Sequence, residues 1–117
     1  MENDYLPLSP LDFAVLLLLE EDGAAYGYGI VKGIADRSRG SIRLAPGNLY
    51  QVLDRLLGRG WIRELRPREQ PEHADGRRRY YGLTPAGRTA LKAEAARLRA
   101  VIPTLERLDL VPARRLR

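Results

Sequence analysis

Side chains suited to base recognition cluster in the segment APGNLYQVLDRLLGRGWI, residues 45–62. Asn48 and Gln51 carry amides, and Arg55 follows four residues later. An amide suits an adenine edge, and a guanidinium suits a guanine edge. Alternatively, Asn48 and Gln51 are solvated surface residues, but their joint position at a predicted helix start favours recognition. A helix start also offers backbone N–H groups to a phosphate. The candidate nucleic-acid contacts are Gly47, Asn48, Tyr50, Gln51 and Arg55.

Arginines form a second candidate site. Three of them, at 77–79, follow the Asp-Gly turn of the polar loop REQPEHADGR, and two more lie at or before the start of the loop. Each phosphate that they neutralise would steepen the salt dependence of nucleic-acid binding. Charges on hairpins also discourage edge pairing, which explains Glu69 and Glu72 but not five arginines around one loop. These arginines are Arg66, Arg68, Arg77, Arg78 and Arg79.

Two helices are predicted before residue 40. Ser9 and Pro10 mark the start of the first, over 9–20, because serine caps and proline suits the first turn. Its run FAVLLLL is apolar all round, which indicates burial on several sides and, in so short a chain, partly by a second subunit. The second helix spans 27–37. Its apolar face comprises Tyr26, Ile30, Val31 and Ile34.

The rest of the chain predicts a third helix, a hairpin and a last helix. The third spans 45–59, and the hairpin pairs strands at 61–67 and 78–83. The last helix spans 85–102, since Pro103 should end or kink it near Ile102. The buried stripe of the third helix is predicted to be Leu49, Val52, Leu53, Leu56 and Leu57.

Leucines seven residues apart on the last helix predict a coiled-coil-like seam between two subunits. The first helix is expected to support this dimer because it has more apolar surface than one small domain can bury. The candidate interface residues are Phe13, Leu17, Leu91, Leu98, Val101, Ile102 and Leu105.

The order of these elements predicts a mainly α fold with a small β-hairpin. Three helices followed by a two-stranded hairpin form a winged helix-turn-helix, in which the helix after the turn lies in the DNA major groove. We expect a winged helix-turn-helix DNA-binding domain over 1–84 and a C-terminal dimerisation helix and tail over 85–117.

Composition supports a nucleic-acid partner. The 117 residues carry a formal net charge of +5, and the pI is near 10.0. An anionic partner is therefore expected, nucleic acid before acidic membrane. The longest apolar run, 13–19, is too short to span a bilayer, and the acidic start MENDYLPL argues against a signal peptide. We expect a soluble, cytoplasmic protein.

Enzyme, metal and cofactor sites are not expected. There is no cysteine, and the one histidine, His73, has no ligand partner at suitable spacing. Ser9, Ser38 and Ser41 have no nearby base, and the carboxylates are scattered. The glycines of GYGIVKG lack the strand and the lysine-hydroxyl ending of a nucleotide loop, so they indicate close helix packing.

Three segments together resemble the PadR-like transcriptional regulators: LDFAVLLLLEEDGAAYGYGI, PGNLYQVLDRLLGRGWI and GRRRYYGLTPAGRTAL. They cover roughly residues 8–91 in the order typical of that family. The resemblance implies a homodimeric winged-helix repressor that binds inverted-repeat operators and dimerises through its last helix, supported by the first. It also implies that Tyr50 contacts the DNA backbone and that the arginines at 77–79 form the basic wing.

The sequence departs from the family in three places. Ala45 stands where a serine-like cap is usual, and Pro103 interrupts the last helix. No tryptophan follows Trp61, so the aromatic-drug site of some family members is not carried over.

We therefore expect a dimeric repressor that binds double-stranded DNA through helix 45–59 and the wing 66–79. The alternative is a winged-helix module that binds a ligand or a protein and not a specific DNA sequence, since fold does not fix function. A small-molecule effector has a candidate position in the dimer cleft near Phe13, Val15 and Leu98, although aliphatic surfaces at helical spacing are usually only core.

Overall fold

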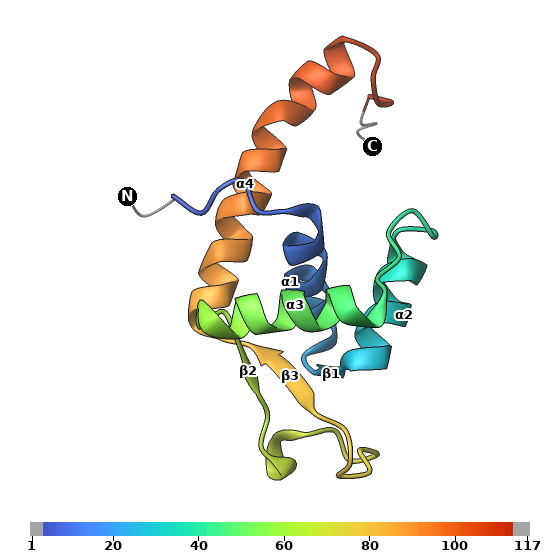
Figure 1. The fold of residues 1–117 in the computed structure, drawn as a ribbon. Helices are drawn as coiled ribbons and strands as arrows, with labels where there is room; N and C mark the ends of the chain where they lie inside the picture. Colours follow the sequence, from blue (N-terminus) through green and yellow to red (C-terminus); the bar gives the residue numbers. More distant parts are fainter. Residues whose placement is uncertain (1–3, 114–117) are drawn as a thin grey trace.

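The computed structural model describes residues 4–113 and confirms the winged helix-turn-helix (Figure 1). Residues 1–3 of the expected domain 1–84 and residues 114–117 of the expected tail lie outside this range. The elements are α1 Pro10–Asp22, β1 Ala25–Tyr26, α2 Gly27–Arg37, α3 Pro46–Gly58, β2 Ile62–Glu64, the 3₁₀ helix η1 Pro67–Glu69, β3 Tyr80–Leu83 and α4 Pro85–Arg107.

Helix α1 is the centre of the core. Its predicted cap is confirmed, because the Ser9 Oγ accepts the Asp12 N–H at 3.1 Å and Pro10 is the first helical residue. The helix ends at Asp22, two residues later than expected. Helices α2, α3 and α4 and strand β3 all contact α1. Its fully buried side chains are Val15, Leu16, Leu18 and Leu19.

Helices α2 and α3 pack on α1 by the faces that periodicity predicted. The bounds of α2 are as expected, and Ile30 and Ile34 are buried. Gly33 allows close packing of α1 and α2, because an added Cβ would lie 2.5 Å from the Leu18 Cδ1. The stripe of α3 is buried except for Leu57, which is 37% exposed. Including Leu57 in the stripe was wrong: it lies one residue, or about 100°, past Leu56 and faces outward.

The sheet has three antiparallel strands in the order β1-β3-β2, and the prediction of two strands is therefore corrected. The added strand is β1, whose Ala25 and Tyr26 pair with Tyr81 and Tyr80. A strand of two residues shows no alternation of apolar and polar side chains, so no pattern predicts it. In the hairpin itself Ile62 pairs with Leu83, and both strands are shorter than expected.

Helix α4 runs to Arg107, so the predicted end at Ile102 is wrong. Pro103 lies inside the helix. A proline removes one helical N–H, and the carbonyl left without it belongs to the exposed Arg99, where water can reach it. The C-terminal half of α4 projects away from the other elements (Figure 1). Within residues 4–113 no helix combines the length and the apolar character needed to cross a membrane.

The backbone just after α3 closely contacts the backbone just before α4. The Trp61 carbonyl accepts the Thr84 N–H at 3.0 Å. Thr84 also caps α4, as predicted, because its Oγ1 accepts the Gly87 N–H at 3.0 Å. A Cβ on Gly87 would lie only 1.9 Å from the Trp61 carbonyl oxygen. Only glycine lets α4 start so close to the end of α3.

Replacing Gly87 by alanine should therefore lower the free energy of unfolding by about 3 kcal/mol or more, because backbone on both sides must move. Urea denaturation followed by circular dichroism measures this change. Gly58→Ala is the control: nothing lies within 4 Å of its Cβ, and alanine at a helix end should be neutral or stabilise by up to about 1 kcal/mol. Equal stability of the two variants would contradict the contact.

Candidate nucleic-acid interface

Helix α3 presents a polar surface opposite its buried stripe. Asn48 and Gln51 are exposed, and Tyr50 is 64% exposed. Ala45, at the N-cap, provides no side-chain hydrogen bond, so the N–H groups of the first turn remain open to an outside acceptor. The outward surface of α3 thus has amides, a phenol and free backbone donors at one end.

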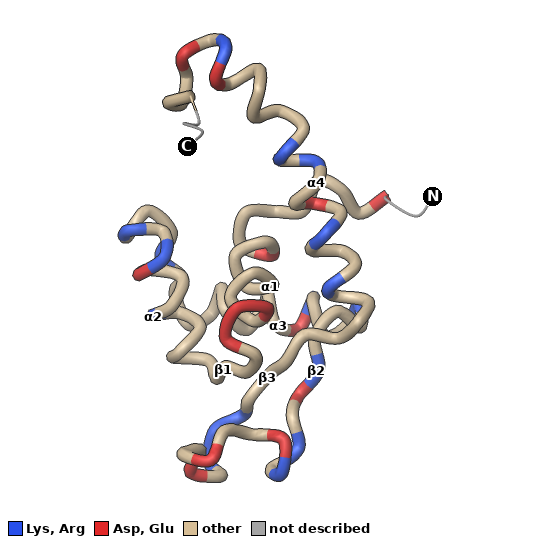
Figure 2. The backbone as a smooth tube through the Cα atoms, turned by 180° about the vertical axis from the view of Figure 1, so that it is seen from behind, with Lys and Arg blue, Asp and Glu red and all other residues tan. Residues whose placement is uncertain are grey.

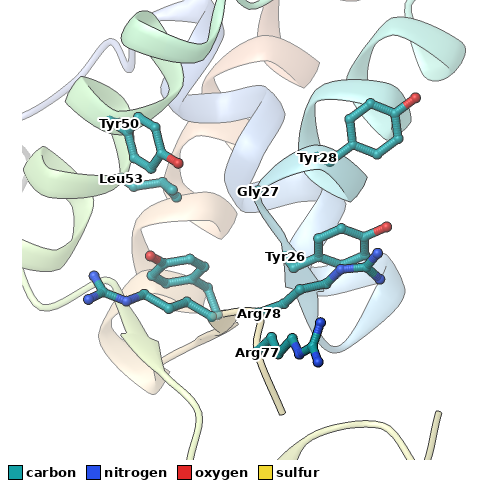
Figure 3. A pocket seen from close by; sticks show the side chains of 9 residues that line it. Tyr26, Gly27, Tyr28, Tyr50, Leu53, Arg77 and Arg78 are labelled. Carbon is teal, nitrogen blue, oxygen red and sulfur yellow. The ribbon is translucent and has the colours of Figure 1, made fainter. Parts of the chain in front are cut away.

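A hollow of about 430 Å³ joins this end of α3 to the wing (Figure 3). Tyr50 and Leu53 of α3 lie on one side of it, and Tyr28 of α2 lies on the other. Arginines at the start of β3 close the third side. Of the predicted α3 contacts, Tyr50 lines this hollow beside the predicted wing arginines, whereas Gly47, Asn48 and Gln51 do not line it. The full lining is Tyr26, Gly27, Tyr28, Tyr50, Leu53, Arg77, Arg78, Arg79 and Tyr81.

The three predicted wing arginines have different surroundings. The Arg78 guanidinium carbon lies 4.3 Å from the centroid of the Tyr26 ring. Arg79 faces Glu64, with 3.8 Å between Nε and Oε1. The Arg77 backbone N–H donates to the Asp75 Oδ1 at 2.9 Å. Within residues 4–113 no carboxylate forms an ion pair with the Arg77 or Arg78 side chain, so both charges are available to a partner.

The wing loop is ordered by a clamp that the sequence did not predict. Arg63 donates to both oxygens of Glu69, at 3.0 and 2.6 Å, and the Arg66 N–H donates to the same carboxylate at 2.9 Å. These bonds, the one from Arg63 first, lower the pKa of Glu69 to about 2. Glu69 is thus a structural partner and not only a solubilising charge. Basic residues lie along both arms of the wing with acidic residues between them (Figure 2).

Arg55 does not join the other α3 candidates. Its Nη2 and Nε donate to the two carboxylate oxygens of Asp12 on α1, at 2.5 and 3.2 Å. The Asp12 side chain is 6% exposed and that of Arg55 41%. The hydrogen bonds that Arg55 donates to Asp12 raise the pKa of Arg55. The guanidinium expected at a guanine edge instead neutralises a buried carboxylate and fixes α3 on α1.

The expected dimer residues divide into two groups. Leu91 is only 5% exposed because it packs in the core of its own chain, so it has little surface for a second subunit. Leu17, Leu98, Val101 and Ile102 are exposed, and Phe13 and Leu105 are half-buried. The predicted seam of α4, called the α4 stripe below, is exposed at Leu98, Val101 and Ile102. These residues lie on the half of α4 that projects from the other elements (Figure 1).

The residues expected near an effector do not share one hollow. An apolar hollow of about 240 Å³ between α1 and α2 includes Phe13, Leu17 and Ile42. Val15, expected to line an effector site, is fully buried, and Leu98 does not line this hollow. In the part of the chain that the structure describes, no three His, Cys, Asp or Glu side chains are grouped to hold a metal ion.

Comparison with known proteins assigns the family. The model of the "Transcriptional regulator PadR-like family" matches residues 15–93, which span α2, α3, the wing and most of α1. The chain belongs to the PadR-like family. Members of this family are DNA-binding transcription regulators and not enzymes.

Solved structures agree with this PadR-like assignment. A transcriptional regulator from Clostridium thermocellum is 27% identical, with a TM-score of 0.67 over 83% of this chain and 87% of that chain. A PadR family transcription regulator from Clostridium difficile R20291 is also 27% identical, with a TM-score of 0.67 over 86% of this chain and 98% of that one.

A curated relative is 40% identical over 74 residues: an uncharacterized 37.1 kDa protein in transposon TN4556 of Streptomyces fradiae. The match covers 63% of this chain and 19% of the relative. The PadR-like chain thus spans about a fifth of the length of that protein.

The ion pair predicts unequal costs for its two partners. Arg55→Ala leaves a buried carboxylate without a partner and should lower the free energy of unfolding by about 3 kcal/mol. Asp12→Ala leaves a guanidinium that can turn to water and should cost about 1 kcal/mol. Urea denaturation measures both, with the exposed Asp54→Ala as the control that should change stability by less than about 0.5 kcal/mol. Equal costs for Arg55→Ala and Asp12→Ala would refute this assignment.

Proposed function

We propose that this PadR-like chain is a dimeric transcriptional repressor that acts in the cytoplasm on double-stranded DNA. The observation that carries the proposal is the hollow that unites the polar end of α3 with the wing. Tyr50, Arg77 and Arg78 line it, and the two arginines have no carboxylate partner within residues 4–113. Cations left unpaired at the junction of a reading helix and a wing suit a sugar–phosphate strand.

In the proposal, α3 enters the major groove by its N-terminal end. Asn48 and Gln51 contact base edges, and the N–H of Gly47 meets a phosphate. Tyr50 lies against the backbone with its phenol. Arg55 has no direct part in base reading, since Asp12 holds it. Direct readout then rests on the two amides, which favours adenine in each half-site.

The wing makes the second contact. Arg77 and Arg78 neutralise phosphates beside the groove that α3 occupies, and Arg79 supports them from its place beside Glu64. The clamp between Arg63 and Glu69 keeps the loop folded before DNA arrives. A folded loop loses less conformational freedom on binding than a disordered one.

A second copy covers the projecting half of α4. Leu98, Val101 and Ile102 are exposed there, and the first helix adds Leu17. Residues 1–84 then act as the DNA-reading unit and 85–117 as the dimerisation unit. Two-fold symmetry would place the reading helices about 34–36 Å apart, on an inverted repeat. An apolar effector in the hollow between α1 and α2 would act on this same α1 surface.

Removing two wing charges should weaken DNA binding and flatten its salt dependence. Arg77→Ala combined with Arg78→Ala should reduce the slope of log K against log salt by about 2, since each lost phosphate contact contributes about 0.9. Fluorescence anisotropy with a duplex selected from random sequences measures the slope. Lys92→Ala with Arg99→Ala is the matched control, because both are exposed on α4 and carry the same total charge.

In the same assay Gln51→Ala should lower the preference for the selected duplex over a scrambled one and leave the salt slope unchanged. Failure of the unaltered protein to bind any duplex, or an unchanged slope in the arginine variant, would instead support a winged-helix module that does not read DNA.

Charges placed on the α4 stripe should separate the dimer. Val101→Glu with Ile102→Glu puts two carboxylates where a second copy is proposed to pack, and burying them unpaired is costly. Light scattering after gel filtration should show a dimer for the unaltered protein and a monomer for this variant. Arg99→Glu, on the same helix outside the stripe, should remain dimeric. A monomeric unaltered protein at micromolar concentration would contradict the proposal.

A further inference from the structure

Arg78 is held by an aromatic ring and not by an acid. Its guanidinium carbon lies 4.3 Å from the centroid of the Tyr26 ring. Within residues 4–113 no carboxylate pairs with Arg78, so the contact with Tyr26 is what fixes its direction. Figure 3 shows the Arg78 side chain extended toward Tyr26, at the side of the hollow nearest α2. A cation over an aromatic face keeps its charge and its N–H donors for another partner.

Tyr26 is itself fixed on two sides. As a residue of β1 it pairs with Tyr80 of β3, and the two rings lie 5.4 Å apart. Its ring also lies against Gly29 of α2, where an added Cβ would be 3.2 Å from the ring Cε1. The ring therefore has little freedom to move. It is a rigid surface between the sheet and the start of α2.

Because the Tyr26 ring is fixed, Arg78 loses less side-chain entropy when it binds a partner. A free arginine side chain loses rotamer entropy when it becomes ordered. Arg78, already extended along Tyr26, has lost part of that freedom during folding. Among the described residues no aromatic ring stacks with Arg77, and Arg79 faces Glu64 instead. Arg78 is thus the one wing arginine between 77 and 79 that is both preordered by a ring and free of an acid.

We propose that Tyr26 is a positioning residue that holds Arg78 ready for a phosphate of the DNA backbone. The inference rests on the proposed function. Tyr26 acts through Arg78 and does not itself read the DNA. The phosphate would lie in the hollow, between the arginine and the surface of α3 that carries Tyr50. The positive end of the dipole of α2, which begins at Gly27, faces the same region.

A double-mutant cycle in the full chain tests this inference. Tyr26→Leu keeps an apolar side chain but removes the ring, and it should weaken binding of the selected duplex about two- to fivefold. Tyr26→Phe keeps the ring and should bind like the unaltered protein. In an Arg78→Ala background, Tyr26→Leu should cause no further loss. A role in folding alone would weaken binding equally in both backgrounds, and that result would overturn the inference, as would full affinity of Tyr26→Leu.

A second pair of variants changes exposed residues only, and it tests the inference even if Tyr26→Leu does not fold. Arg78→Lys and Arg77→Lys both keep the charge at exposed positions. Only Arg78 stacks on a ring, and lysine replaces a stacked guanidinium poorly. Arg78→Lys should therefore weaken binding more than Arg77→Lys, and equal affinities would refute the inference. Failure of the unaltered protein to bind duplex DNA would be a different result, because it would refute the proposed function as well.

Discussion

Burial of α1 is the constraint on which the rest of the structure depends. This helix is apolar on nearly all sides, and a small chain can hide it only by packing α2, α3, α4 and β3 around it. The positions of α3, the sheet and the long helix α4 thus all follow from the burial of α1. Asp12 is the buried charged side chain of α1, and its ion pair with Arg55 links α1 to α3.

The same packing makes α3 and the wing parts of one body. Trp61 is buried, with Tyr5 against its ring at 4.9 Å, and its carbonyl meets the start of α4. The strand that begins at Ile62 therefore leaves the core at a set angle. Any partner that touches both α3 and the wing meets two surfaces whose separation is fixed by the core.

Local sequence patterns predicted the features that depend on residues close together in the chain. The cap at Ser9, the bounds of α2 and the stripe of α3 all follow from spacings within one or two turns. Contacts between distant residues had no such signal: Asp12 and Arg55 lie 43 positions apart, and β1 has only two residues. The residue types at Tyr50 and 77–79 suggested a site, but only the fold showed that Tyr26 and Tyr28 line the same hollow.

The clamp of Arg63 on Glu69 fixes the shape of the β2 arm of the wing, residues 63–69, in the free protein. A rigid arm cannot change its shape to fit a target, so it discriminates between targets by their shape. If the wing meets a duplex as proposed above, stretches whose groove dimensions fit it bind without deformation, and others must bend or widen first. Base composition at positions that no side chain touches would then influence which sites are occupied.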